Sequence, residues 1–474
     1  MPTDSAGRIG VAAGAVVLVL VAWLLARLIS RRTGWEPAGP IALIAAVPFV
    51  PYVPLVSGLS LDDLLPIVGL VMLAWRAKVP RFTTDPILRF VLVAIAVTVV
   101  ARVLSALVNG GEVAGTVSML AKAVARPVLL VGIAAYVAFA IPEDLRRRFV
   151  TLAVAAVGTF EAAFGLIAFA IPLPGGVGIE AARRLTSLYG VCPGRIAGTL
   201  GLSPNHLGAV FVVTLPVTIG QALSRTGWWR WAWTGAAVLQ VAALFLTFTR
   251  SSILLALAAT LVFLLVYRQV LLLAVMTAAS GALLFAILSV GCQASPGQHG
   301  LPGDPLGVVG GRFSDGNDRL ALWYAAAHIT LDHPLAGVGL GEMGATLKAA
   351  PAYSRTPYGT ATSSAHNTVL LAGAETGVGG ALAAAAINIG LALVALRCAW
   401  RGRKRHDPLL AAAALAILTF LAQGMFNNLF EVGATGVLLA LLVGGFASGD
   451  AAEPQERNPY TSPVTDDTGL EGEH

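Results

Sequence analysis

Residues 251–290 read SSILLALAATLVFLLVYRQVLLLAVMTAASGALLFAILSV, two apolar runs separated by a short polar turn that contains Arg268. Each run is long enough to cross the hydrocarbon core of a bilayer, about 30 Å thick, as an α-helix. Such runs recur along a chain that is 57% hydrophobic and only 12% charged. Soluble proteins carry about a quarter charged residues, so the composition excludes a water-soluble fold. The sequence shows no short alternating segments of the β-barrel kind. We therefore predict an all-α polytopic membrane protein.

Hydropathy places about 12–13 membrane-spanning helices in a single transmembrane domain over residues 1–447. The expected bounds, each uncertain by a few residues, are 9–29, 40–58, 61–76, 86–108, 119–140, 149–171, 204–223, 231–249, 251–267, 270–290, 366–396, 408–427 and 431–447. The remaining segment, 448–474, is acidic and rich in Pro and Thr, and we expect a disordered cytoplasmic tail.

Lysine and arginine gather in alternate connections between these spans. They follow the first, third, fifth, seventh, ninth and eleventh spans, with a dense group over residues 397–405. The positive-inside rule makes these connections cytoplasmic. We expect the N-terminus outside and the C-terminus in the cytoplasm. The net charge of +6 is then a matter of topology and does not indicate a nucleic-acid partner.

The same alternation places two long polar segments outside, at about 172–203 and 291–365. In the second, apolar residues repeat at helical spacing: Leu320, Trp323, Tyr324, Ala327 and Leu331. We predict an amphipathic helix over Asp318–Asp332, with Pro334 beyond its end. This helix is expected to lie near the membrane interface or to pack over the span bundle.

Arg250 is the most informative polar residue on the expected outer face. It lies in the stretch Thr247-Phe248-Thr249-Arg250-Ser251-Ser252, a turn with almost no loop between two apolar runs. A charge so close to the hydrocarbon is costly and tends to be functional. The neighbouring hydroxyls suit an oxyanion. The alternative is a side chain that reaches out to lipid headgroups, and we favour the anion-binding role over it.

His366 and Arg319 are further candidates on the same face. His366 lies where the second long loop re-enters the membrane, and histidine is the natural general base near neutral pH. A polar cap is the alternative there, and Asn367 is a candidate cap for the following helix. Glu375 lies deeper in that helix and is a candidate to orient His366 or to bind a neighbouring helix. For Arg319, a functional role and a solvated helix face are equally compatible with the sequence.

Arg195 and Asn205 lie in the segment that leads the first long loop into a span. Pro204 suits a helix start, and Asn205 with His206 is a candidate either for substrate contact or for helix capping. Arg312 is a further arginine on the outer face, where the orientation rule does not explain basic residues.

Three other signals carry less weight. The stretch Gly337-Val338-Gly339-Leu340-Gly341 resembles a dinucleotide loop but lacks a βαβ context, and we read it as a turn. Asp62 and Asp63 suit a helix start better than a metal site, and the histidines do not fall at zinc-ligand spacing. Cys192 and Cys292 share the outer face, where a disulfide between the two long loops is a reasonable hypothesis, whereas Cys398 is on the cytoplasmic side.

Several stretches together resemble the O-antigen ligase and O-antigen polymerase superfamily of membrane glycosyltransferases. Each is weak alone, but their order, with a large outer loop before the histidine, is fairly specific. They are Arg195-x-x-Gly198 with Pro204-Asn205, Thr247-Phe248-Thr249-Arg250-Ser251, Asp318-Arg319-x-x-x-Trp323, Pro334-Leu335-x-Gly337-Val338-Gly339, and His366-Asn367 followed by Glu375-x-Gly377.

This resemblance implies a GT-C-type bundle in the plasma (inner) membrane and a polyprenyl (undecaprenyl) diphosphate-linked glycan donor used on the outer face. It implies that Arg250 and Arg319 engage the diphosphate and that His366 acts as the base or positions the acceptor, which is lipid- or glycan-linked. We expect the other substrate-binding residues to be Arg195, Asn205, Arg312, Trp323, Asn367 and Glu375. Paired arginines can neutralise the leaving group with fixed donors, so we expect transfer without a metal or another cofactor. We expect backside attack of the acceptor hydroxyl, which makes the transfer inverting.

Two alternatives stay open. A polymerase would use the same donor chemistry with a second lipid-linked glycan as acceptor. A secondary transporter would need ionisable groups near the membrane centre, and four mid-span residues could form such a network: Arg102, Lys122, Arg126 and Glu161. Replacement of Glu161 is expected to abolish transport but to affect an outer-face transferase only mildly.

Overall fold

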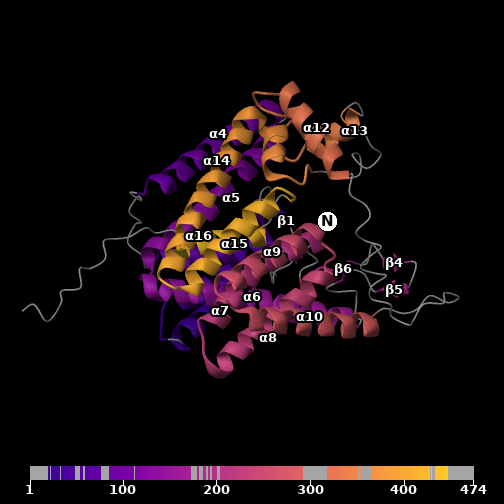
Figure 1. Cartoon of the computed structure of the whole chain (residues 1–474). Helices are drawn as coiled ribbons and strands as arrows, with labels where there is room; N and C mark the ends of the chain where they lie inside the picture. Colours follow the sequence, from indigo (N-terminus) through magenta and orange to yellow (C-terminus); the bar gives the residue numbers. More distant parts are fainter. Residues whose placement is uncertain are drawn as a thin grey trace, which may run out of the picture.

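The computed structural model is a bundle of long helices with a few very short strands (Figure 1). It describes residues 20–21, 23–32, 34–47, 54–56, 59–75, 85–110, 113–171, 179–180, 185–187, 190–192, 195–199, 203–291, 318–350, 353, 364–427, 429 and 433–446. The expected disordered tail and Arg312 lie outside these residues. So does the proposed disulfide, since Cys292 and the side chain of Cys192 are not described.

The helices of the bundle agree closely with most of the predicted spans. They are α3 (Leu61–Ala74), α4 (Pro86–Asn109), α5 (Val113–Ala140), α6 (Glu143–Ala170), α7 (Pro204–Leu223), α8 (Gly227–Leu246), α9 (Arg250–Val266), α10 (Val270–Gly291), α14 (Thr368–Lys404), α15 (Pro408–Gly424) and α16 (Gly433–Phe446). Among the described residues, 5 helices are long and apolar enough to cross a membrane by length and composition, namely α4, α6, α7, α10 and α14. The chain is an all-α polytopic membrane protein, as predicted.

The predicted span over residues 40–58 is wrong. Helix α2 covers only Ala38–Ala45, and β1 (Pro54–Val56) pairs with β2 (Leu59–Ser60) in an antiparallel hairpin. Prolines recur at every third position after this helix, at Pro48, Pro51 and Pro54. Proline lacks an amide donor and clashes with the preceding helical turn, so a hydrophobic run of this kind does not form one helix.

The other strands lie in the first long loop. β3 (Ile179–Glu180) pairs with β6 (Arg195–Ile196), and β4 (Leu185–Ser187) pairs with β5 (Gly190–Cys192), both antiparallel. The β3–β6 pair matters most here, because β6 carries Arg195 and leads into α7.

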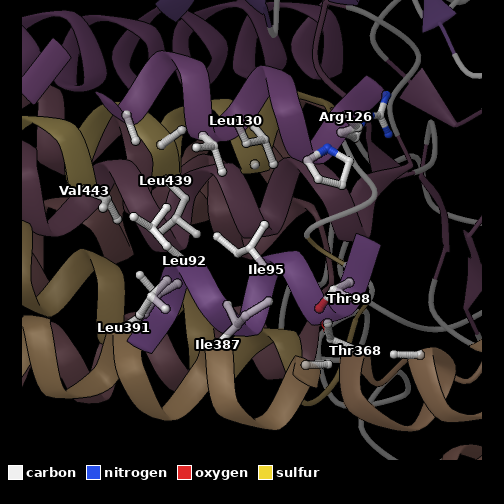
Figure 2. A pocket seen from close by; sticks show the side chains of 18 of the residues that line it. Leu92, Ile95, Thr98, Arg126, Leu130, Thr368, Ile387, Leu391, Leu439 and Val443 are labelled. Atoms are coloured by element: carbon white, nitrogen blue, oxygen red, sulfur yellow. The ribbon is translucent and has the colours of Figure 1, made fainter. Parts of the chain in front are cut away.

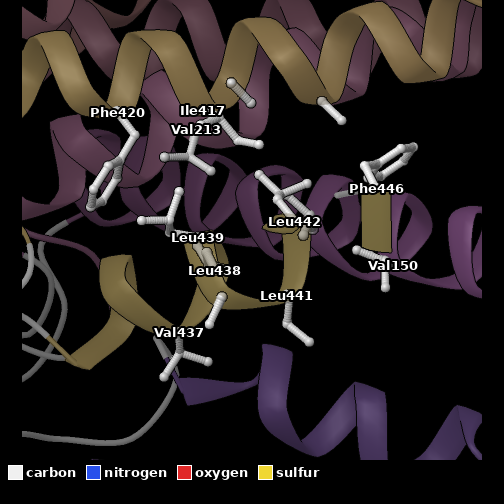
Figure 3. Close-up of a cluster of buried hydrophobic side chains, with 14 of the residues drawn as sticks. Val150, Val213, Ile417, Phe420, Val437, Leu438, Leu439, Leu441, Leu442 and Phe446 are labelled. Carbon is white, nitrogen blue, oxygen red and sulfur yellow. The ribbon is translucent and has the colours of Figure 1, made fainter. Parts of the chain in front are cut away.

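Helix α16 is buried among its neighbours in the middle of the largest apolar cluster. Figure 3 shows leucines of α16 beside side chains of α7 and α15, among them Val213 and Phe420. Small residues bring the helices close, since a Cβ added at Gly444 would lie 2.6 Å from the carbonyl oxygen of Ala134 in α5. Close packing of this kind holds helices together in lipid, where the hydrophobic effect offers little.

Helix α14 is broken at Gly377, whose φ of 77° is left-handed. The turn that follows α12 (Asp318–Asp332) supplies the missing backbone partners. The amide of Val338 donates to the carbonyl of Ala374 (2.9 Å), and the amide of Val378 donates to the carbonyl of Pro334 (2.8 Å). Non-helical backbone at membrane depth is tolerated only where it is paired inside the protein. The Pro334–Gly339 and Glu375–Gly377 stretches of the sequence are therefore two halves of one structural joint.

Helix α12 has the predicted bounds but buries a different face. Leu322, Ala326 and Ile329 are buried and pack with residues of α13 (Met343–Ala349) and α14, whereas Leu320 is 63% and Leu331 is 70% exposed. The alanines on the buried face let α12 approach α14 closely. Figure 1 shows α12 and α13 together at one end of α14. The helix thus packs over the span bundle, one of the two predicted positions.

Replacement of Gly377 by alanine tests the joint. An added Cβ would lie 2.4 Å from the carbonyl oxygen of Pro334, and the positive φ strains any L side chain. We expect Gly377→Ala to cost about 1–3 kcal/mol of stability and to lower the thermal unfolding midpoint in detergent. Gly379→Ala is the matched control, because nothing lies within 4 Å of its added Cβ. Equal midpoints for the two variants would show that the joint does not stabilise the fold.

Candidate functional site

Four charged or titratable residues from distant parts of the chain meet at one end of the bundle. Arg319 at the start of α12 interacts electrostatically with Arg250 at the start of α9 and with His366 just before α14. His366 in turn interacts with His206 in the first turn of α7. We refer to Arg250, Arg319, His206 and His366 as the arginine–histidine cluster.

Arg250 is the first residue of α9 and follows a tight turn in which Phe248 has a φ of 50°. The first amides of a helix lack intrahelical partners and carry a partial positive charge, which adds to that of the guanidinium. The hydroxyls of this turn have partners within the protein. Thr249 Oγ1 donates to the carbonyl of Pro204 (3.1 Å), and the Oγ of Ser252 accepts from Gln423 Nε2 (2.9 Å). Their observed bonds stabilise the turn that presents Arg250.

Arg319 points into the bundle and not onto a solvated helix face. Its guanidinium carbon lies 5.9 Å from the ring centroid of Phe426, and Trp323 lies against the same ring at 6.1 Å. Burial, and then the charge of Arg250, lower the pKa of the Arg319 guanidinium. Phe426 thus lies beside the arginine–histidine cluster. Its sequence context does not predict this position.

His366 lies just before α14, and its neighbour Asn367 fixes the start of that helix. Asn367 caps the helix, since its Oδ1 accepts from the amides of Val369 and Leu370 at 3.0 Å each. Its Nδ2 donates to the carbonyl of Met425 (3.1 Å), next to Phe426. Asn367 is buried. Its predicted role as the cap of this helix is confirmed, and the cap fixes the helix start next to His366.

The surroundings of His366 favour its neutral form. Burial, and then the positive charge of Arg319, lower the pKa of His366 from the ordinary value of 6.5. A neutral imidazole has one nitrogen free to accept a proton, so a lowered pKa keeps His366 competent as a base at neutral pH.

Arg195 and Asn205 lie against the turn that precedes Arg250. The Nη2 of Arg195 donates to the side-chain oxygens of Asn205 (2.9 Å) and Thr249 (3.1 Å), and its Nε donates to the carbonyl of Thr247 (2.7 Å). The structure thus brings together these two sequence-predicted residues and the turn that carries Arg250. These contacts give them a positioning role.

Glu161 in α6 holds the segment that carries Arg195. Its carboxylate accepts from the amide of Thr199 (3.0 Å) and from the hydroxyl of Thr199 (2.7 Å), and the side chain is fully buried. A Cβ at Gly198 would lie 2.5 Å from Glu161 Oε2, so this close approach requires glycine. The chain of contacts runs from Glu161 through Arg195 to Arg250. A variant of Glu161 is therefore expected to disturb the cluster as well.

Glu375 lies elsewhere, in the wall of a cavity between α4, α5, α14 and α16 (Figure 2). It lies about 10 Å further along the axis of α14 than Thr368, at the rise of an ideal helix. Arg102 and Arg126 line the same cavity, whose volume is about 260 Å³. The suggested mid-span network is therefore divided, with Glu161 at the Thr199 turn and the two arginines at this cavity. The side chain of Lys122 lies outside the described residues.

Removal of the Glu161 carboxylate tests the support of the Arg195 segment. Glu161→Leu leaves the amide and hydroxyl of the half-buried Thr199 without this acceptor, which costs about 1–3 kcal/mol. Glu161→Gln keeps an acceptor oxygen and is expected to cost less. Thermal unfolding in detergent ranks the three proteins, and a leucine variant as stable as the wild type would contradict this role.

Replacement of Arg319 tests the electrostatic coupling in the cluster. The positive guanidinium disfavours the imidazolium, so Arg319→Gln is expected to raise the pKa of His366. Histidine-selective isotope labelling and an NMR pH titration measure the shift, with His366→Gln to identify the resonance. His333, which is exposed, serves as the internal control for sample conditions. An unchanged pKa of His366 would show that the two side chains are not coupled.

Residues 235–385 match the family model described as O-Antigen ligase. The matched segment runs from α8 into α14 and includes Arg250, Arg319 and His366. None of the curated proteins matches the chain.

Proposed function

We propose that the chain transfers a glycan from a polyprenyl (undecaprenyl) diphosphate donor to an acceptor hydroxyl, and the match of residues 235–385 to the O-antigen ligase family model supports this proposal. The match itself indicates a ligase or polymerase type of activity in general. The donor, the stereochemistry and the residue roles are our proposal. The resemblance also favours a GT-C-type bundle.

The observation that carries the proposal is the meeting of Arg250, Arg319 and His366. The segments that hold them start three different helices, yet two guanidinium groups and a histidine come together. Like charges in a partly buried site repel each other, and an anion between them relieves that repulsion. Guanidinium groups match phosphate oxygens in geometry and charge. A diphosphate would neutralise the two guanidinium groups, and the neutral histidine beside it could accept a proton.

The reaction follows from this arrangement. The acceptor oxygen attacks the anomeric carbon from the face opposite the diphosphate, and the bond between that carbon and the diphosphate oxygen breaks. The electron pair of that bond leaves with the diphosphate, whose growing charge Arg250 and Arg319 neutralise. His366 takes the proton of the acceptor hydroxyl. Attack from the opposite face inverts the anomeric configuration.

The neighbouring residues support this chemistry. Arg195 contacts Asn205 and the turn before Arg250, and Asn367 caps the helix that begins just after His366. Trp323 and Phe426 form an aromatic wall beside Arg319 that suits contact with a sugar face. Arg312 and Glu375 remain candidates for substrate contact from the sequence.

We place the cluster on the outer face of the membrane. At the opposite end of the bundle Arg397 in α14 forms an ion pair with Asp85 before α4, and that end carries the arginine-rich connection after α14. The positive-inside rule makes that end cytoplasmic. The predicted termini, outside for the N-terminus and cytoplasmic for the C-terminus, follow the same rule. The acceptor on the outer face is lipid- or glycan-linked in this proposal.

The test is transfer from a purified polyprenyl-diphosphate oligosaccharide in proteoliposomes, with and without a metal chelator. Wild-type transfer is expected to persist with the chelator. His366→Ala is expected to reduce the rate about 10²–10⁴-fold, the usual contribution of a general base. Arg250→Gln is expected to reduce it about 10²–10³-fold, the usual effect of losing one charge-stabilising donor.

Matched controls separate chemistry from folding. His333→Ala removes an exposed histidine, and Arg268→Gln removes an exposed arginine at the other end of α9, so both should retain activity. Full activity in folded His366→Ala and Arg250→Gln proteins would overturn the assignment of the cluster. No turnover with several acceptors, together with substrate-dependent flux in the same vesicles, would favour a transporter instead.

A further inference from the structure

The cavity between α4, α5, α14 and α16 extends along the bundle. On α4 its lining runs from Leu88 to Arg102, about 20 Å at the rise of an ideal helix. That is about two-thirds of the hydrocarbon thickness of a bilayer. Phe139 at the inner end of the lining is 44% exposed on the side of the bundle, so this part of the cavity reaches the surface that faces lipid.

The cavity is polar at one end and apolar at the other. Figure 2 shows Arg126, Thr98 and Thr368 at one end, and Leu391 and Val443 at the other. The charged side chains in the described lining are Arg102, Arg126 and Glu375, so two positive charges and one negative charge leave +1. Charged groups at membrane depth are costly and mark binding sites or pathways. The polar end therefore suits an anion, and the rest suits hydrocarbon.

The dimensions favour one chain. Ligand pockets commonly measure about 300–1,000 Å³, and this cavity has about 260 Å³ along its length. A slender single-chain lipid fits such a channel better than a phospholipid with two acyl chains. The negative phosphate of such a lipid matches the net positive charge at the polar end of the cavity.

The polar end of the cavity includes a residue that is close in the chain to the proposed base. Thr368 lines the cavity and also begins α14, immediately after the residues Asn367 and His366. In the proposed function the diphosphate of the donor lies at Arg250 and Arg319. The arginines of the cavity are a separate pair, on α4 and α5, and suit a second phosphate. A lipid held there would extend its headgroup toward His366.

We propose that this cavity binds the single apolar chain of a polyprenyl-phosphate lipid that anchors the acceptor, with its phosphate at Arg102 and Arg126. The acceptor role rests on the proposed function, while the binding of the lipid does not. The acceptor is then a lipid-linked glycan presented to His366 by its own anchor, and the protein holds two lipids at once.

A binding experiment tests the site without transfer. Undecaprenyl phosphate carries no glycan, and its binding to the full chain in detergent can be followed by native mass spectrometry. The measurement uses the Arg250→Gln background, so that the arginine–histidine cluster contributes less. Undecaprenol, which lacks the phosphate, and phosphatidylglycerol, which has two chains, are the comparison ligands.

Two substitutions on α5 form a matched pair. Val131 lines the cavity, whereas Val128 is 58% exposed on the lipid-facing surface. Val131→Phe is expected to weaken undecaprenyl phosphate binding about tenfold or more, as an extra group in an apolar pocket does, and Val128→Phe is expected to leave it unchanged. Leu439→Trp fills the same cavity from α16 and serves if Val131→Phe does not fold.

The headgroup is tested at the polar end. Arg126→Gln is expected to weaken undecaprenyl phosphate binding about tenfold, since a charge-assisted contact is lost, and to leave undecaprenol binding unchanged. Equal binding by Val131→Phe and Val128→Phe, or equal loss of both lipids in Arg126→Gln, would overturn the proposal. Displacement by phosphatidylglycerol at the same concentration would overturn the single-chain occupant.

Transfer kinetics then test the acceptor role. Val131→Phe is expected to raise the KM for a lipid-linked acceptor about tenfold and to leave the KM for the donor unchanged. A raised donor KM alone would overturn the acceptor role while the function stands. If Val131→Phe loses lipid binding but the wild type transfers no glycan, the lipid site stands and the proposed function is overturned.

Discussion

The pairing of every backbone amide and carbonyl at membrane depth is the constraint on which this structure depends. Most of the chain meets it with continuous helices, but α14 does not, because it is interrupted at Gly377. The turn after α12 lies against the interruption and pairs with it, and Ser105 of α4 adds a hydrogen bond to the carbonyl of Glu375 (2.6 Å). One joint therefore connects α4, α12 and α14, and it fixes where α12 begins relative to the start of α14. Arg319 and His366 lie at those two helix starts.

A second set of contacts positions the other half of the cluster. It begins at a buried carboxylate in α6, passes through the Thr199 turn to Arg195, and ends at the turn before α9. Each step joins segments that are far apart in the chain. Two sets of contacts therefore position the cluster. One is the backbone pairing at the Gly377 joint, and the other is the series of side-chain hydrogen bonds from Glu161 to the turn before α9. Preorganised charges of this kind act on a transition state without the cost of rearrangement.

The arrangement separates two kinds of cationic group. Arg250 and Arg319 lie at helix starts at one end of the bundle, and Arg319 also lies beside the ring of Phe426. Arg102 and Arg126 lie within helices, at the head of an apolar channel. The first environment suits the leaving group of a reaction, and the second suits the headgroup of a lipid whose chain remains in the membrane. The proposed transfer between two membrane-bound molecules uses both.

Much of the fold and part of the site follow from local sequence. Long apolar runs must be helices in lipid, so most spans, and the bounds of α12, could be predicted. The run at 40–58 is not one helix, because it carries a proline at every third position, which hydropathy does not register. Arg250 and His366 stood out for a local reason as well, since each is a polar residue at the edge of an apolar run.

Contacts between distant segments needed the tertiary structure. The bond of Glu161 to Thr199, the ring of Phe426 beside Arg319, and the buried face of α12 each depend on how helices pack, which no local pattern encodes. The cavity is a property of four helices together. The sequence by itself determined most of the segments that enter the membrane and which polar residues stand at their ends, because the cost of burying charge and unpaired backbone in lipid acts locally. Only the tertiary structure decided which of those residues meet, because side-chain packing selects among the many arrangements that lipid alone permits.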